Sequence, residues 1–334
     1  MAVYFCSDGG GTKLLMLAFD ENLRLLAGVR GPAVTTTYIT PELARENLFA
    51  TLRQLISMLP AEVCPEGQRL KVECLYQTSA GGVRPGDVLY QLADVGGVVD
   101  IGEGPCGILA GTAGGTGILT LAGTGSDCFY IRDTKRITGI GGFGPVLGDE
   151  GSGYDLGRQT LCAAIQADEG RGPATLLRDY IFEDYGLQTR MWELVDIVYS
   201  SPDSRKPVAR ATYTLARAAK DGDAVALDIL ERAGRRLATD TMALLRRIGE
   251  DESCTLPVTV SGGVWKIHPL VWNTYRSLLL ESYPHLHICA PYFEPVMAGV
   301  IHHLLQREGE VSAGRLQQLR QNFTPYVLDD FFAG

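Results

Sequence analysis

The stretch "SDGGGTK", residues Ser7–Lys13, follows the apolar run "AVYFC" at the start of the sequence. An acid, three consecutive glycines and a hydroxyl therefore stand directly after the first expected strand. Glycine loses more backbone entropy on folding than other residues, so three in a row indicate a backbone that must approach something closely. Two explanations fit this stretch by itself: a tight hairpin, or a turn whose N–H groups bind a phosphate.

A similar pattern recurs in the second third of the chain. The first pattern consists of expected strands at 2–7, 13–20 and 23–30, and the second of expected strands at 117–122, 127–132 and 136–140. In both patterns a glycine–threonine turn joins the first two strands and a short polar turn joins the next two. The shared order indicates an internal duplication of one strand–hairpin–strand unit.

Most of the chain after residue 150 has apolar residues at helical spacing, interrupted by two further apolar strands. Strands followed by helices in both halves predict an α/β fold of two related domains. We place these domains at residues 1–115 and 116–294, and the C-terminal helix and tail, 295–334, could join the first domain. Because no Pro- or Ser-rich linker separates the halves, we expect them to face each other across a cleft.

The composition argues against several classes of protein. A net charge of −9 over 334 residues leaves no basic excess for neutralising nucleic-acid phosphates. No signal-peptide pattern and no apolar run of membrane-spanning length occurs, so we expect a cytoplasmic protein without nucleic-acid or membrane partners. The eight cysteines form no CxxC pair, which predicts free thiols rather than a metal site or a disulfide framework.

Other nucleotide and hydrolase motifs fit poorly. A Walker loop requires Ser or Thr after its lysine, whereas Leu14 follows Lys13. Two GxGxxG matches, at 102–107 and 139–144, lack the strand–turn–helix setting and the ribose-binding acid of a Rossmann fold. The nucleophile elbow GxSxG and the zinc motif HExxH do not occur in the sequence.

Four glycine-rich segments follow apolar strands: "DGGGTK" (8–13), "LAGTGSD" (121–127), "GGFGPVLGDEGSG" (141–153) and "VSGGVWK" (260–266). Two such turns, one from each half of a duplicated fold, could grip a polyphosphate from opposite sides. Together the segments resemble the phosphate-1, phosphate-2, substrate-loop and adenosine motifs of the BadF/BadG/BcrA/BcrD ATPase family, especially its N-acetylglucosamine kinase branch. The resemblance covers essentially the whole chain. It implies a duplicated ribonuclease H-like fold, as in the actin, Hsp70 and sugar-kinase superfamily, with two domains around a nucleotide cleft.

The resemblance also implies ATP and Mg²⁺ as ligands and gives individual residues a role. Asp8 would hold Mg²⁺ through water, and Asp149 would accept hydrogen bonds from sugar hydroxyls. The contacts to the ATP phosphates would be Gly9, Gly10, Gly11, Thr12 and Lys13 in the first domain and Gly123, Thr124 and Gly125 in the second. Ala209, Gly262 and Gly263 would lie along the adenosine, and the other sugar contacts would be Thr36, Gly142, Phe143 and Gly144. For Phe143, packing in the core is the alternative.

The sequence departs from the family pattern where the acceptor should bind. Kinases of this kind carry "NDA" or "TDA", whose Asp is the general base, but the matching segment here is "VVDIGEGPCGIL" (98–109). Counting back from the second glycine turn reaches Glu103, with Asp100 as the alternative base. A solvated loop acid is the other explanation for Glu103. The family's sugar-binding Asn is also absent, because the matching region has Thr35–Thr37.

These observations predict an ATP-dependent kinase that phosphorylates an amino sugar such as N-acetylglucosamine, or a relative such as N-acetylmuramic acid or glucosamine. The alternative is an ATP-binding sensor or regulator of the same family with weak or no kinase activity. The iron–sulfur branch of the family fits less well, because no cysteine lies beside the "GTG" turn in the expected place. The apolar tail could dock on a second copy in a homodimer or fold back on its own chain.

Overall fold

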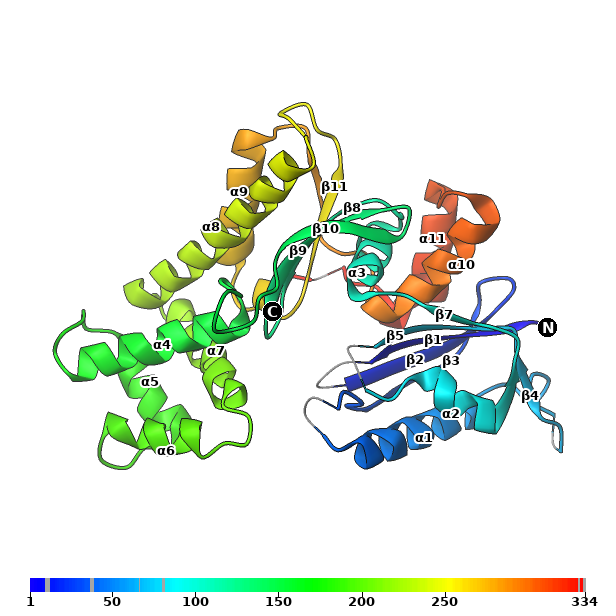
Figure 1. Cartoon of the computed structure of the whole chain (residues 1–334), viewed down its shortest axis with the longest axis horizontal. Helices are drawn as coiled ribbons and strands as arrows, with labels where there is room; N and C mark the ends of the chain where they lie inside the picture. The colour runs from blue at the N-terminus through cyan, green and yellow to red at the C-terminus, as the bar shows by residue number, and fades with distance from the viewer. Residues whose placement is uncertain (10–12, 37–38, 66, 80–81, 330, 333–334) are drawn as a thin grey trace. The chain divides into compact units, whose positions relative to one another are not determined.

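The computed structural model describes residues 1–334 except 10–12, 37–38, 66, 80–81, 330 and 333–334 (Figure 1). The chain divides into two compact units, each built from several segments of the sequence. The first unit consists of Met1–Gly117, Ile131–Arg136 and Pro291–Asp329. The second unit contains Ile118–Tyr130, Ile137–Ala290 and the tail residues Phe331 and Phe332.

The first unit is built on a five-stranded sheet with the order β3-β2-β1-β5-β7. β1 pairs antiparallel with β2 and parallel with β5, β2 pairs antiparallel with β3, and β5 pairs parallel with β7. The strands are β1 (Val3–Gly9), β2 (Lys13–Asp20), β3 (Leu25–Pro32), β5 (Cys74–Ser79) and β7 (Val98–Asp100). A separate parallel pair is formed by β4 (Leu70–Val72) and β6 (Ala93–Val95).

The second unit repeats this arrangement in the order β10-β9-β8-β11-β12. Its strands are β8 (Gly117–Ala122), β9 (Ser126–Arg132), β10 (Lys135–Gly141), β11 (Pro257–Ser261) and β12 (His287–Ile288). β8 takes the place of β1, and it pairs parallel with β11, which pairs parallel with β12. The prediction of a duplicated ribonuclease H-like α/β fold is therefore confirmed.

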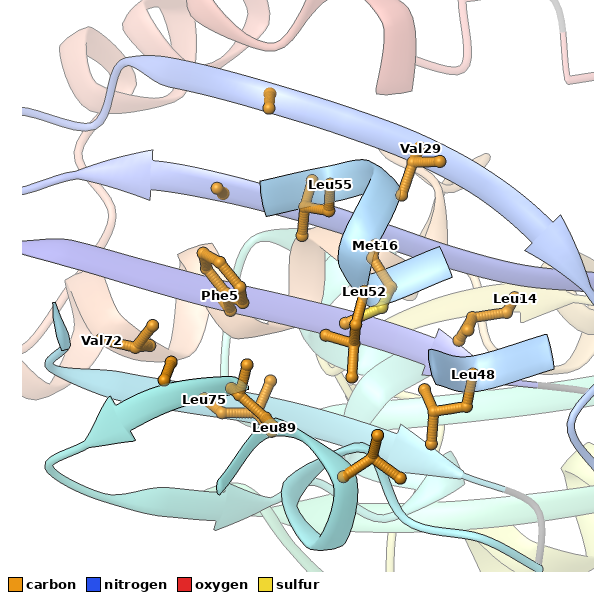
Figure 2. Close-up of a cluster of buried hydrophobic side chains, with 14 of the residues drawn as sticks. Phe5, Leu14, Met16, Val29, Leu48, Leu52, Leu55, Val72, Leu75 and Leu89 are labelled. Carbon is orange, nitrogen blue, oxygen red and sulfur yellow. The ribbon is translucent and has the colours of Figure 1, made fainter. Parts of the chain in front are cut away.

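Two apolar layers cover the first sheet, because successive side chains along a strand point to opposite faces. Phe5, Leu14 and Met16 pack with residues of α1 (Pro41–Ser57) and α2 (Pro85–Leu92), as Figure 2 shows for Leu48, Leu52, Leu55 and Leu89. Pro41 stands in the first turn of α1, and the hydroxyl of Thr40 caps this helix by accepting the N–H of Leu43.

The opposite face of this sheet is covered largely by the C-terminal segment. Cys6, Leu17 and Phe19 pack with residues of α3 (Glu103–Thr112), η3 (Pro295–Met297), α10 (Ala298–Glu308) and α11 (Ala313–Asn322). In this layer the hydroxyl oxygen of Tyr76 lies 3.0 Å from Nδ1 of His303. Phe323, from the end of α11, is completely buried. This second core layer of the first unit therefore joins its N-terminal strands to the C-terminal segment.

The second unit carries most of the helices. They are α4 (Gly153–Asp168), α5 (Leu176–Tyr185), α6 (Leu194–Tyr199), α7 (Arg205–Lys220), α8 (Ala224–Arg247) and α9 (Pro269–Ser282), with short turns η1 (Met191–Glu193) and η2 (Val264–Lys266). A buried hydroxyl network joins the sheet to α8 and α9: Thr120 lies 2.8 Å from both Thr241 and Tyr275. Because each hydroxyl both donates and accepts, this network satisfies polar groups that burial would otherwise penalise.

The tail folds back on its own chain, which is the second of the two alternatives. After η4 (Thr324–Tyr326), the ring of Phe332 stacks on Trp272 at 4.3 Å, and Lys266 lies over the ring of Phe331 at 4.7 Å. All eight cysteines are free, as predicted. Within the described ranges, none of the helices combines the length and the apolar character that crossing a bilayer requires.

Candidate functional site

The first site segment lies where β1 ends. Asp8 and Gly9 are the last two residues of this strand and are paired in register with Thr78 and Ser79 of β5. A Cβ on Gly9 would lie 2.8 Å from Cγ2 of Val34, so close packing alone requires glycine at this position. Gly10, Gly11 and Thr12, the remaining predicted phosphate contacts of this turn, lie outside the described residues.

Lys13 begins β2 immediately after this turn and forms an ion pair with Glu294. Its Nζ lies 3.3 Å from Oε2 of Glu294, and both side chains are about one-quarter to one-third exposed (34% and 24%). Glu294 stands just before η3 and was missed by the sequence analysis, since no motif surrounds it and 281 positions separate it from Lys13. Only the three-dimensional fold brings the two charges together.

Asp8 lies among these charges in an environment that disfavours its ionised form. Its pKa is raised to about 6, mainly because surrounding protein atoms desolvate the carboxylate, with further increases from Glu294 and Glu103. The ammonium of Lys13 opposes this shift. A carboxylate held in this way gains from a nearby cation, which is what a magnesium-binding acid requires.

The two candidate bases have different environments. Asp100, the last residue of β7, accepts hydrogen bonds from Gln77 Nε2 at 2.7 Å and Arg84 Nη1 at 3.4 Å, and its side chain is 60% exposed. Glu103 is the first residue of α3, where the helix dipole favours a negative charge. It keeps much of its surface open, while neighbouring protein atoms raise the pKa of its carboxyl and Arg136 lowers it. Glu103 therefore begins a helix rather than lying in a loop, and it interacts electrostatically with Asp8.

Thr36 also belongs to the first unit and is half-buried. A Cβ on Gly82 would lie 2.9 Å from its backbone nitrogen, so the segment after β3 lies against the segment after β5. Thr36 thus follows a strand of the same sheet as Asp8, although no contact places it at a sugar. Its predicted role remains a prediction.

In the second unit the glycine turn after β8 is joined to two other predicted segments. The N–H of Gly153 donates to the carbonyl of Gly123 at 2.7 Å, and the N–H of Tyr154 donates to that of Thr124 at 3.3 Å. A Cβ on Gly262, whose φ is +108°, would lie 2.2 Å from the carbonyl oxygen of Ala122. The phosphate-2, substrate-loop and adenosine segments therefore meet at the end of β8.

The adenosine contact predicted on α7, Ala209, lies where α7 packs against α4. Ala209 is half-buried, and its Cα would lie 3.1 Å from a Cβ built on Gly157. Gly263 is exposed and has open space around it. Thr212, three residues along α7, comes within 4.0 Å of a Cβ on Gly153, so α7 also borders the glycine turn after β8.

The substrate loop, 141–152, is an irregular segment with several positive φ angles. Gly142 and Gly144 have φ of +73° and +82°, and Asp149 has φ of +60° although it is not glycine. Asp149 is 8% exposed and its Oδ1 accepts the N–H of Gly144 at 3.2 Å. Phe143 is 72% exposed, so the alternative that it packs in the core is wrong.

Magnesium is compatible with this donor set. Mg²⁺ is usually bound through one or two carboxylates, with water and substrate phosphates filling the remaining positions. Among the described residues, no group of three or more His, Cys, Asp or Glu side chains could hold a metal ion directly. Asp8, acting through water next to a phosphate-binding turn, is the carboxylate that fits this mode.

One family model and two curated relatives match most of this chain. The sequence model of the BadF/BadG/BcrA/BcrD ATPase family matches residues 8–288. An N-acetylmuramic acid/N-acetylglucosamine kinase of Clostridium acetobutylicum is 25% identical over 88% of this chain and 95% of its own length. An N-acetyl-D-glucosamine kinase of Dictyostelium discoideum is 24% identical over 90% of this chain and 97% of its own.

The fold is also found among solved structures. A candidate N-acetylglucosamine kinase of Chromobacterium violaceum superposes with a TM-score of 0.66 at 20% identity, covering 90% of this chain and 98% of the other. At this level of identity the likeness concerns the fold, which is the duplicated sheet described above.

Proposed function

The chain belongs to the BadF/BadG/BcrA/BcrD ATPase family, and on that premise we propose that it transfers the γ-phosphate of ATP to a hydroxyl of an amino sugar, such as N-acetylglucosamine. The observation that carries the proposal is the placement of two carboxylates in the first unit: Asp8 at the end of β1 and Glu103 at the start of α3. Two curated relatives named as amino-sugar kinases, which match nearly the full chain, support it.

The two carboxylates have separate roles in this proposal. Asp8 would orient Mg²⁺ through water, and the ion would neutralise charge on the transferred phosphoryl group. Glu103 would accept the proton of the attacking hydroxyl. Neighbouring protein atoms partly desolvate the carboxyl of Glu103 and raise its pKa, which makes it a stronger base than an ordinary carboxylate. Its open surface leaves it accessible to an acceptor.

The second unit would supply uncharged donors. In the turn Gly123–Gly125, a glycine stands on each side of Thr124. Because glycine has no side chain, the backbone of this turn can approach a phosphate closely. Because this turn is hydrogen-bonded to Gly153 and Tyr154, the phosphate turn and the start of α4 would move as one piece. Asp149 would contact the sugar from the loop that precedes α4.

The test is ADP formation from ATP and Mg²⁺ with a panel containing N-acetylglucosamine, glucosamine, N-acetylmuramic acid and glucose. We expect at least one amino sugar to raise ADP formation more than tenfold above the background, with a phosphorylated sugar detected by mass spectrometry. The sensor alternative predicts nucleotide binding without sugar-dependent turnover. If no sugar raises the rate, the kinase proposal is wrong.

A further inference from the structure

A cavity of about 180 Å³ lies within the second unit, between the substrate loop, β9 and α8. Water occupies about 30 Å³ per molecule in the liquid, so the cavity has room for about six waters, or for one ring-sized polar ligand. Its lining includes Thr120, Cys128, Phe143, Asp149, Arg236 and Asp240.

Acidic side chains dominate the charge of this lining. Three carboxylates, Asp149, Glu150 and Asp240, line it together with one guanidinium, Arg236. A fourth lining acid, Asp127, takes part in a further interaction and does not enter this balance. Arg236 is shared, because its Nη2 lies 3.5 Å from Glu150 and its Nε lies 3.4 Å from Asp240. Burial and the neighbouring Glu150 raise the pKa of Asp240 even though Arg236 lowers it. One cation therefore serves two carboxylates, and a third, that of Asp149, borders the same space.

The lining also contains uncharged polar groups. Thr120 and Cys128 belong to the buried network with Thr241 and Tyr275. Asp149 uses Oδ1 for the N–H of Gly144, and a carboxylate can accept several more hydrogen bonds. Phe143 and Leu147 border the cavity and are largely exposed, at 72% and 81%. Carboxylates with an exposed aromatic ring beside them suit a polyhydroxylated ligand.

We propose that this cavity selects among sugars by charge: it accepts a neutral or ammonium-bearing amino sugar and rejects one that carries a carboxylate. The inference rests on the proposed kinase function, because Phe143 and Asp149 belong to the loop expected to contact the sugar. Like charges brought together in a partly desolvated site repel strongly, so an anionic substituent meets a lining in which three carboxylates outnumber one guanidinium by two. An ammonium or a hydroxyl group meets acceptors instead.

The experiment compares kcat/KM for N-acetylglucosamine, glucosamine, N-acetylmuramic acid and the neutral amide of N-acetylmuramic acid. The amide keeps the bulk of the lactyl group without its charge. We expect N-acetylmuramic acid to be at least about 30-fold worse than N-acetylglucosamine, and its amide to recover most of that loss. Equal use of the acid and the neutral sugar overturns the inference and leaves the kinase proposal standing.

Rejection of both the acid and its amide would also overturn the inference, because size rather than charge would then decide. Two variants test the charge directly. Asp240→Asn should reduce the discrimination against the acid about three- to tenfold, and Arg236→Gln should increase it. Asp228→Asn is the matched control, since Asp228 lies on the same helix in an exposed pair with Arg232 and does not line the cavity. It should leave the ratio unchanged.

Binding measured without turnover tests the charge preference of the cavity separately from the proposed kinase activity. Isothermal titration of glucosamine and of N-acetylmuramic acid reports the charge preference even if catalysis is slow, and thermal melting of each variant shows that it is folded. A preference for the amine supports the inference. If no sugar of the panel binds or is phosphorylated, the kinase proposal fails and the inference fails with it.

Discussion

β1 and β8 occupy the same place in two sheets of the same strand order, yet their ends differ chemically. β1 ends in Asp8, which is surrounded by Lys13, Glu103 and Glu294. β8 ends in Ala122, and the turn after it consists of Gly123, Thr124 and Gly125 without a charge. The two copies of the duplicated unit thus have the same sheet, which the apolar pattern of the strands specifies. The residues at the ends of the strands differ. The first unit offers charged groups, and the second offers backbone donors and a cavity.

The largest expected effect is on catalysis in the first unit. Glu103→Gln removes the proposed base while keeping its shape, so we expect kcat for sugar phosphorylation to fall by about 10²–10⁴, the usual contribution of a general base. Binding of ATP should be retained, which isothermal titration can check.

Asp100→Asn is the control for this variant. Asp100 is held by Gln77 and Arg84 at the edge of the sheet, so its loss should change kcat by less than about threefold. The opposite result, with Asp100→Asn inactive and Glu103→Gln active, would transfer the role of base to Asp100.

The second prediction concerns Asp8, where one substitution should change stability and function in opposite directions. Its raised pKa means that the folded state holds a proton more tightly than the unfolded chain does. The stability associated with this group is complete below pH 3.8 and is lost as pH rises through about 6. Asp8→Asn should therefore stabilise the nucleotide-free protein by about 3 kcal/mol at pH 7.5 and by about 0.5 kcal/mol at pH 4.

The same substitution should abolish magnesium-dependent turnover. Chemical denaturation at the two pH values, together with the kinase assay, checks both halves of this prediction. A variant that is less stable than the parent at pH 7.5 would show that the ionised carboxylate is not penalised in the folded state.

A third prediction concerns the second core layer of the first unit. His303 is buried and contacts Tyr76, and burial, followed by Arg307 and His302, lowers its pKa to about 4. A depressed pKa gives stability that is present above the unfolded value of 6.5 and lost as pH falls toward 4. Between pH 7 and pH 5 the free energy of unfolding should fall by about 2 kcal/mol from this residue alone.

His303→Phe should remove this component of the pH dependence. The corresponding network of the second unit, Thr120, Thr241 and Tyr275, does not titrate in this range and provides no matching loss. Denaturation curves of the parent and of His303→Phe at pH 7, 6 and 5 make the comparison. If the free energy of unfolding changes by the same amount with pH in the parent and in His303→Phe, the prediction is wrong.

The smallest effect is on nucleotide affinity. Glu294→Gln removes a negative charge beside Lys13 and Asp8, so the ammonium becomes more available to a phosphate. We expect ADP to bind about three- to tenfold more tightly, measured by isothermal titration. Glu308→Gln, which breaks the exposed pair with Arg315 in the same unit, is the control and should leave ADP binding unchanged. Weaker binding by Glu294→Gln would mean that Glu294 orients Lys13 instead of competing for it.

The sequence predicted the strands well because their signal is local. The expected strands at 23–30 and 136–140 correspond to β3 (Leu25–Pro32) and β10 (Lys135–Gly141) within two residues at each end. Apolar runs bounded by glycine and polar turns are sufficient for such assignments. The same local signal revealed the duplication, whereas the order of the strands in each sheet came from the structure.

The parts of the site that were missed depend on long-range packing. Glu294 reaches Lys13 from a segment with no motif, and Arg236 and Asp240 reach the substrate loop from the middle of α8. The left-handed backbone of Asp149 could not be foreseen either, because aspartate adopts it only where the surrounding loop enforces it. Sequence reasoning therefore found the turns but not the charges that the fold gathers around them.

The core layer shared by Cys6, Phe19, Ile301 and Phe323 has a consequence for biosynthesis. On the ribosome, the strands of the first unit emerge at the beginning of translation, but α10 and α11, which cover much of one face of their sheet, are made last. The second unit has nearly all of its segments available once residue 290 has emerged. The unit translated first should consequently complete its folding second, and until then its uncovered face is a surface for chaperones to bind.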